Sequence, residues 1–114
     1  MSIQRLEPGK RLAGAVIHGN TVYLSGQVGQ PGSDVSEQAK QALAEVDRLL
    51  ALAGTDKSKI LQCIIWLSDM RDFAAMNAVW DTWVDPANPP ARATGEARLA
   101  TAGHLVEFTV TAAL

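Results

Sequence analysis

The chain has 114 residues and a mass of 12.1 kDa, a length that suits one compact domain and excludes two domains of ordinary size. Its apolar fraction of 47% and charged fraction of 19% are typical of a folded globular protein and exclude a disordered chain. The net charge of −2 and pI near 5.6 argue against nucleic-acid binding, which usually requires a basic patch. We therefore expect one domain over residues 1–114, without a membrane span or a signal-peptide core.

The first third of the chain predicts strands and then a helix. Residues 12–18 and 21–28 flank the turn-forming pair Gly19-Asn20, so we expect two antiparallel strands joined by a tight turn. A weaker alternation over residues 3–6 suggests an edge strand before them. On the second strand, Ser25 points away from the Val/Leu face because side chains alternate across a strand.

The next elements are a helix and a strand. The tetrad Asp34-Val35-Ser36-Glu37 has the pattern of a capping box, and apolar residues at helical spacing follow it as far as Gly54. Residues 60–67 are short, apolar and β-branched, which predicts a central or parallel strand buried on both faces. Cys63, the only cysteine, lies in that strand and should be an inert buried thiol, so we expect a cytoplasmic protein.

A second helix should follow, capped by Asp69 or Asp72 and ended by Pro86. Asn77 lies on its apolar stripe, and a buried amide must find hydrogen-bond partners, so this side chain either pins a loop or faces a site. The aromatic residues of the stripe are expected to fill the core. The stripe comprises Phe73, Met76, Trp80, Trp83 and Val84.

The last third resembles a hairpin of residues 91–99 and 105–113, joined by a turn at residues 101–104. The element order is then β-β-α-β-α-β-β, which predicts an α+β fold with both helices packed on one face of a mixed sheet. Glu107 is a carboxylate within the dense last strand, close to the middle of the sheet.

Nucleotide and zinc sites are excluded because the chain has no glycine-rich phosphate loop, no HExxH and no cysteine pair. Ser25 lacks the strand–turn context of a nucleophile.

A cation and a carboxylate remain, Arg92 and Glu107, on strands that we expect to be adjacent. Arg92 follows Pro89-Pro90, which hold the chain extended, and its guanidinium can bind a carboxylate through two hydrogen bonds. Glu107 could orient or deprotonate a water, although spacing alone favours a structural ion pair or two unrelated surface charges.

Four segments in this order and spacing resemble the Rid family of reactive-intermediate deaminases, also called the YjgF/YER057c/UK114 family. They are Ser25-Gly26-Gln27, residues 69–77, Pro90-Ala91-Arg92-Ala93-Thr94 and Val106-Glu107. The resemblance covers nearly the whole chain. The short loop before the first helix and the segments Asn77-Ala78-Val79-Trp80-Asp81 and Trp83-Val84 look more like the YoaB-like branch than the founding deaminases.

The resemblance implies a chorismate-mutase-like fold and a homotrimer with sites between subunits. It implies that Arg92 binds the carboxylate of a 2-imino acid and Glu107 positions the hydrolytic water, as the catalytic pair. Ser25, Asn77 and Thr94 would border the pocket. The implied substrates are 2-iminobutanoate and 2-iminopropanoate, which become 2-keto acids and ammonia without any metal or cofactor, and neither nucleic acid nor membrane is an expected partner.

The chain departs from the founding members at three places near this pocket. Leu12-Ala13-Gly14 replaces a segment that carries a tyrosine, Thr94 replaces a common cysteine, and Gly95 stands where a β-branched residue is usual. Two other functions stay open. One is a non-catalytic trimer that binds a small carboxylate or regulates a partner protein, and the other is an endoribonuclease or translation inhibitor, which the acidic pI disfavours.

Overall fold

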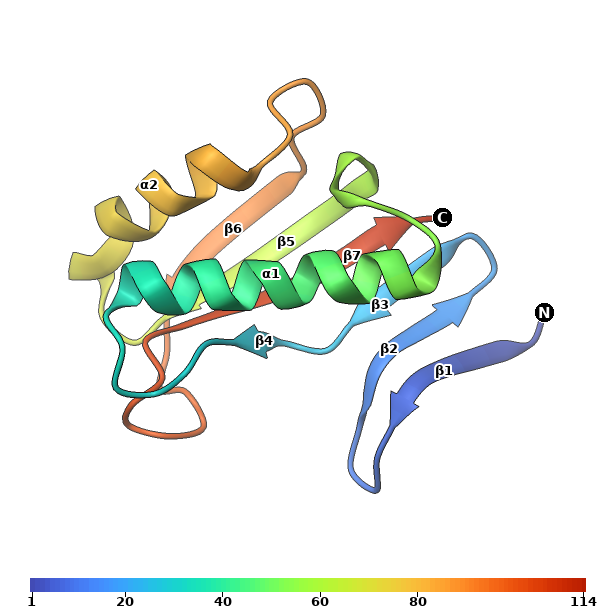
Figure 1. Cartoon of the computed structure of the whole chain (residues 1–114), viewed down its shortest axis with the longest axis horizontal. Helices are drawn as coiled ribbons and strands as arrows, with labels where there is room; N and C mark the ends of the chain where they lie inside the picture. Colours follow the sequence, from blue (N-terminus) through green and yellow to red (C-terminus); the bar gives the residue numbers. More distant parts are fainter.

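The computed structural model describes residues 1–114 and consists of a mixed sheet with two helices on one face (Figure 1). Single turns of 3₁₀-helix precede β5 and α2, at Lys57–Lys59 and Met70–Asp72. Neither helix has the length and hydropathy that a membrane crossing needs. The elements are β1 (Ile3–Pro8), β2 (Ala13–His18), β3 (Thr21–Leu24), β4 (Gln27–Val28), α1 (Val35–Ala53), β5 (Ile60–Leu67), α2 (Phe73–Trp83), β6 (Ala91–Glu96) and β7 (Val106–Ala113).

The strands lie in the order β1-β2-β3-β7-β5-β6, and the short β4 pairs with β7 beyond the end of β3. All pairs are antiparallel except β5 with β6, so the predicted α+β fold with a mixed sheet is confirmed. The predicted hairpin between residues 91–99 and 105–113 is wrong, because β5 lies between β6 and β7. The connection crosses the end of β5, where Ala97 donates to the Leu67 carbonyl and Ser68 donates to the Leu105 carbonyl.

The predicted hairpin at Gly19-Asn20 is confirmed, and the edge strand extends to Pro8. The strand expected over residues 21–28 is instead interrupted after Leu24. At this break the Ser25 amide donates to the Gly14 carbonyl of β2, and the chain then bends so that β4 pairs with β7. The interruption opens the sheet beside α1 (Figure 1).

The helix ends follow the local sequence signals. Asp34 caps α1 by accepting a hydrogen bond from the Glu37 amide at 2.9 Å, and Gly54 ends the helix in the left-handed conformation at φ 89°. Of the two expected caps of the second helix, Asp69 accepts from the Arg71 amide and caps the 3₁₀ turn that leads into α2, whereas the Asp72 side chain makes no capping bond.

One core of 21 buried apolar residues fills the space between the helices and the inner face of the sheet. Cys63 is fully buried there, as predicted. Trp80 is also in the core, where its ring stacks on Phe108 at a centroid distance of 6.2 Å, whereas Trp83 is only partly buried.

The prediction that β5 is buried on both faces is wrong, because the helices cover only the inner face. Ile65 and Leu67 point into the core, but Trp66 on the outer face is 39% exposed and Leu61 at the β5 bulge is 52% exposed. Tyr23 of β3 adds a 49% exposed ring to the same outer face. The sheet thus presents large apolar side chains on the side without helices.

Candidate functional site

Arg92 lies near the start of β6, on the inner face of the sheet and in register with Cys63 of β5. Its guanidinium carbon lies 5.2 Å from the centre of the Trp80 ring and 6.0 Å from that of Phe73. Such cation–π contacts fix the position of a guanidinium without using its N–H donors. Arg92 makes no ion pair within the chain, so these donors can bind an anion.

Two buried polar atoms without hydrogen-bond partners lie on the elements that flank Arg92. They are Oδ1 of Asn77 and Oγ1 of Thr94. Asn77 shares a face of α2 with Phe73 and Trp80, whose rings contact Arg92, and Thr94 lies two residues beyond Arg92 on the same face of β6. A buried polar atom left unpaired costs about 1–3 kcal/mol, so both atoms are candidates for contacts from outside the chain.

The neighbouring Cys63 is not a nucleophile. Burial raises the pKa of its thiol to about 12, although the positive charge of Arg92 acts in the opposite direction. The reactive thiolate is therefore scarce at neutral pH, in agreement with the inert thiol expected from the sequence.

Glu107, the second candidate residue, lies on the outer face of the sheet, where it pairs with Trp66 of β5 and Val28 of β4. A Cβ on Gly26 would lie only 2.7 Å from the carboxyl carbon of Glu107, so any larger residue at position 26 would displace this carboxylate. Glu107 and Ser25 line one hollow of about 500 Å³ between the β1–β2 hairpin, α1 and the β3–β4 break. The other lining residues are Glu7, Leu12, Gly14, Gly26, Gln27, Arg48 and Leu49.

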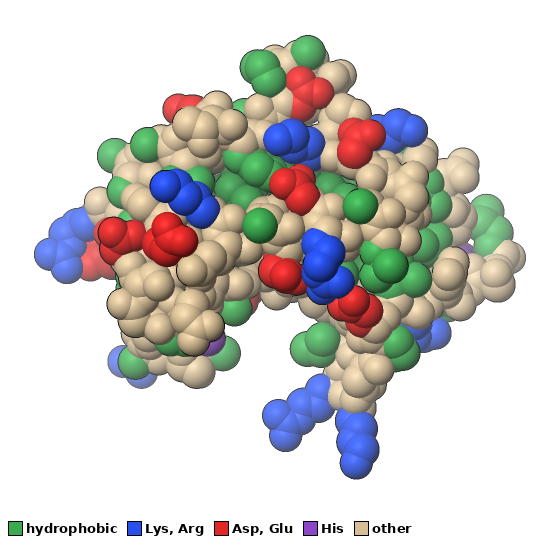
Figure 2. All heavy atoms as spheres, in the orientation of Figure 1, with side chains coloured by type: hydrophobic (Ala, Val, Ile, Leu, Met, Phe, Trp, Pro, Cys, Tyr) green, Lys and Arg blue, Asp and Glu red, His purple; other side chains and the backbone are tan.

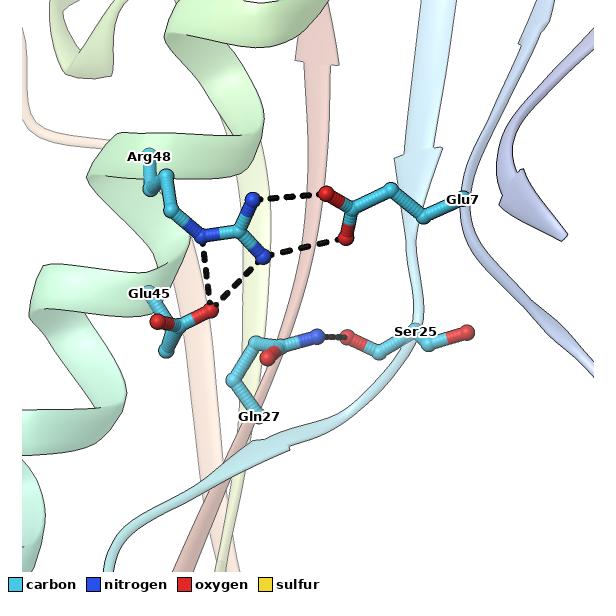
Figure 3. A network of polar contacts seen from close by, with 5 residues as sticks. All are labelled: Glu7, Ser25, Gln27, Glu45 and Arg48. Carbon is cyan, nitrogen blue, oxygen red and sulfur yellow. Dashed lines mark hydrogen bonds and ion pairs between the residues drawn. The ribbon is translucent and has the colours of Figure 1, made fainter. Parts of the chain in front are cut away.

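Ser25 closes the break between β3 and β4. Its hydroxyl donates to the Ala13 carbonyl at 2.5 Å, and its own carbonyl accepts a hydrogen bond of 2.9 Å from the Gln27 amide group (Figure 3). Because its hydroxyl donates to the Ala13 carbonyl and no histidine lines the hollow, Ser25 can accept a hydrogen bond from a ligand but is not arranged as a Ser–His nucleophile.

One chain does not bring Arg92 and Glu107 together. The expectation of adjacent strands is wrong, since β5 separates β6 from β7 and the two side chains lie on opposite faces. Arg92 pairs with Cys63 of β5, and Glu107 pairs with Trp66 of the same strand. The two residues are therefore separated by two inter-strand spacings across the sheet and by three residues along the strands, which gives a Cα separation of about 14 Å. The sequence identified both residues, but the sheet order that separates them had no local signal.

Two lining residues escaped sequence analysis. Arg48 of α1 and Glu7 of β1 form an ion pair at 2.7 Å across 41 positions of the chain. Nothing in their local patterns distinguishes them from other surface charges. No group of three or more His, Cys, Asp or Glu side chains is placed to hold a metal ion.

The subunit has an α+β fold, with a guanidinium that makes no ion pair on one face of the sheet and a carboxylate on the other. The family model described as Endoribonuclease L-PSP matches residues 2–114. The chain therefore belongs to this family, which is the YjgF or Rid family that the sequence resembles.

Named relatives and solved structures agree with this assignment. The chain is 45% identical to a RutC family protein of Haemophilus influenzae over 98% of both chains, and 40% identical to the RutC family protein YoaB of Escherichia coli over the full length of both. A crystal structure of a YjgF family member from Neisseria meningitidis superposes with a TM-score of 0.97 at 42% identity, covering 99% of this chain and 95% of the other. A 2-iminobutanoate/2-iminopropanoate deaminase of Rattus norvegicus is 33% identical over 82% of this chain and 73% of its own.

Proposed function

We propose that the protein hydrolyses small 2-imino acids, such as 2-iminobutanoate and 2-iminopropanoate, to 2-keto acids and ammonia. The observation that carries the proposal is the unpaired guanidinium of Arg92 beside the two orphan polar atoms of Asn77 and Thr94. A 2-imino acid offers a carboxylate for the guanidinium and an adjacent N–H group for an acceptor. The 33% identical rat deaminase supports the same substrate class.

In this proposal each residue has a defined role in the reaction. Arg92 binds the substrate carboxylate through two parallel hydrogen bonds, while Asn77 and Thr94 orient the nitrogen end. Glu107 takes a proton from a water as the water oxygen adds to the imine carbon, and this proton passes to the imine nitrogen. The resulting carbinolamine loses ammonia as its hydroxyl becomes the keto group, so one water is consumed per ammonia released. The imine carbon is already electrophilic, and the proposal includes no metal or cofactor.

The active unit in this proposal is a homotrimer with sites between subunits. Arg92 and Glu107 lie on opposite faces of one sheet, about 14 Å apart, so a small ligand that reaches both must lie between two copies. Each site would combine Arg92, Asn77 and Thr94 of one subunit with Ser25 and Glu107 of another. The exposed rings of Tyr23 and Trp66 on the outer face support burial against further copies.

The proposal keeps the cytoplasmic location expected from the single buried cysteine. A small 2-imino or 2-keto acid is the partner, and neither nucleic acid nor membrane is part of it. The family model is described as an endoribonuclease, but the pI near 5.6 disfavours RNA as the substrate here.

The experiment generates 2-iminopropanoate and 2-iminobutanoate in place with an amino-acid oxidase and traps them with semicarbazide. Native protein should suppress semicarbazone formation, and Arg92→Ala should lose about 100-fold in kcat/KM because it removes two charged hydrogen bonds. Arg71→Ala is the matched control, since Arg71 pairs with Asp69 on the surface. Turnover equal in native protein and Arg92→Ala would refute the proposal. Binding of 2-oxobutanoate by native protein without turnover would favour the non-catalytic carboxylate-binding alternative.

A further inference from the structure

The β1–β2 hairpin forms one wall of the hollow that contains Glu107, and it stands apart from the body of the molecule. β1 pairs only with β2, and Figure 2 shows the hairpin projecting downward with Lys and Arg side chains at its tip. Leu12, in the hairpin turn just before β2, is 63% exposed and lines the same hollow as Ser25 and Glu107. The position of this wall therefore depends on what ties the hairpin to α1.

Arg48 of α1 provides that tie (Figure 3). Its Nη1 and Nη2 donate to the two carboxylate oxygens of Glu7 at 2.7 and 3.0 Å, and its Nε donates to Glu45 at 3.0 Å. These hydrogen bonds lower the pKa of the Glu7 carboxyl and raise that of Arg48, so both groups stay charged at neutral pH. A guanidinium fork that bridges two elements in this way fixes their relative orientation as well as their distance.

Glu7 itself has an unusual backbone. It is the one non-glycine residue with positive φ, at 50°, a left-handed conformation that a glutamate adopts only when its surroundings impose it. Beyond it, the Gly9 amide donates to the Leu12 carbonyl at 2.7 Å and closes the hairpin turn. The conformation of Glu7 thus determines the direction in which the chain enters the turn that carries Leu12.

We propose that Arg48 is a positioning residue for substrate selection. By holding Glu7 in its left-handed conformation, it fixes the β1–β2 hairpin and places Leu12 against the side chain of the substrate. This inference rests on the proposed function, in which Arg92 binds the carboxylate and Glu107 positions the water. Arg48 then acts on the KM for substrates with longer apolar side chains, and it has no part in the chemical step.

The experiment compares steady-state hydrolysis of 2-iminobutanoate and 2-iminopropanoate by native protein and Arg48→Ala. The KM for 2-iminobutanoate should rise about tenfold, the lower end of the range that one methylene contributes in an apolar pocket, while kcat stays within about twofold. The KM for 2-iminopropanoate should rise less. Arg48→Lys should have a KM close to that of Arg48→Ala, because an ammonium group cannot form the paired hydrogen bonds to both oxygens of Glu7. Arg71→Ala, which breaks an exposed ion pair outside the hollow, should change neither constant.

Glu7→Gly removes the carboxylate that Arg48 binds. Glycine accepts the left-handed conformation but offers nothing to Arg48, so this variant should fold and show the same rise in KM as Arg48→Ala. The double variant, Arg48→Ala with Glu7→Gly, should have a KM no higher than that of either single variant, because both substitutions remove the same contact. Additive effects on KM would overturn the inference.

Amide hydrogen exchange separates this inference from the proposed function. Exchange in β1 and β2 should accelerate in Arg48→Ala, and unchanged exchange would overturn the tie itself. Faster exchange with unchanged KM would overturn the positioning role. If native protein shows no turnover, the proposed reaction fails. The affinity for 2-oxobutanoate then replaces KM, and equal affinity in native protein and Arg48→Ala would overturn the inference as well.

Discussion

Replacing Gly26 by alanine should disable catalysis while leaving the fold intact. The new Cβ would lie 2.7 Å from the carboxyl carbon of Glu107 and 2.8 Å from its Oε2. Since nonbonded carbon atoms prefer about 3.5–4.0 Å, the carboxylate must move by about 1 Å. The displaced group is the end of a flexible side chain on the outer face, so the backbone need not adjust.

A displacement of about 1 Å of a catalytic group lowers the rate by about 100-fold, which corresponds to about 2.7 kcal/mol in the activation free energy. We therefore expect the kcat of Gly26→Ala for 2-iminobutanoate to fall about 100-fold. The thermal unfolding midpoint and the affinity for 2-oxobutanoate, which Arg92 binds in our account, should stay close to native values. A kcat within threefold of native would refute the assignment of Glu107 to the chemical step. A fall in kcat together with a marked fall in the thermal unfolding midpoint would show that the alanine acts on the fold instead.

Other substitutions and reagents test neighbouring parts of the account. In Gly29→Ala the Cβ would lie 2.5 Å from the Cα of Gln38, which is a backbone atom. This variant should therefore lower the thermal unfolding midpoint markedly, and an unchanged midpoint would contradict the close packing of Gly29 against α1. Thr94→Val removes a buried hydroxyl that has no hydrogen-bond partner within the chain. It should raise the KM for 2-iminobutanoate, and chemical denaturation should show a change of no more than about 1 kcal/mol in the free energy of unfolding. Cys63, with a pKa of about 12, should resist iodoacetamide at pH 8 in the folded protein and react once the protein is unfolded; rapid labelling of the native protein would contradict its burial.

The parts of the fold predicted correctly are those that local chemistry determines. Asp34 and Gly54 mark the ends of α1, and Gly19-Asn20 marks a tight turn, because each acts on neighbours within a few residues. The pairing of β6 with β5 instead of β7 involves segments far apart in sequence. Two strand patterns around a turn-rich segment are typical of a hairpin and also of two strands that pair with a third between them. Periodicity therefore could not identify the partner of β6.

For the candidate site, the sequence indicates individual residues but not how the fold places them. The sequence singled out Arg92, Glu107 and Asn77, since a cation after two prolines, a carboxylate in an apolar strand and an amide on an apolar stripe each need an explanation. It could not show that Arg92 and Glu107 occupy opposite faces, because a residue's face is known only once the order of the strands is known. The Glu7–Arg48 pair joins the first strand to the middle of α1, and no pattern near either residue indicates it.

In the proposed homotrimer each active site combines Arg92 of one subunit with Glu107 of another, and mixing of two inactive variants tests this arrangement. Arg92→Ala and Glu107→Ala should each be inactive alone. After dissociation and reassembly of an equal mixture, about one quarter of the sites in a closed ring should contain both native residues, so about a quarter of native activity should return. Recovery near that level would support a shared site. An inactive mixture, with subunit exchange verified by a mass tag, would contradict it.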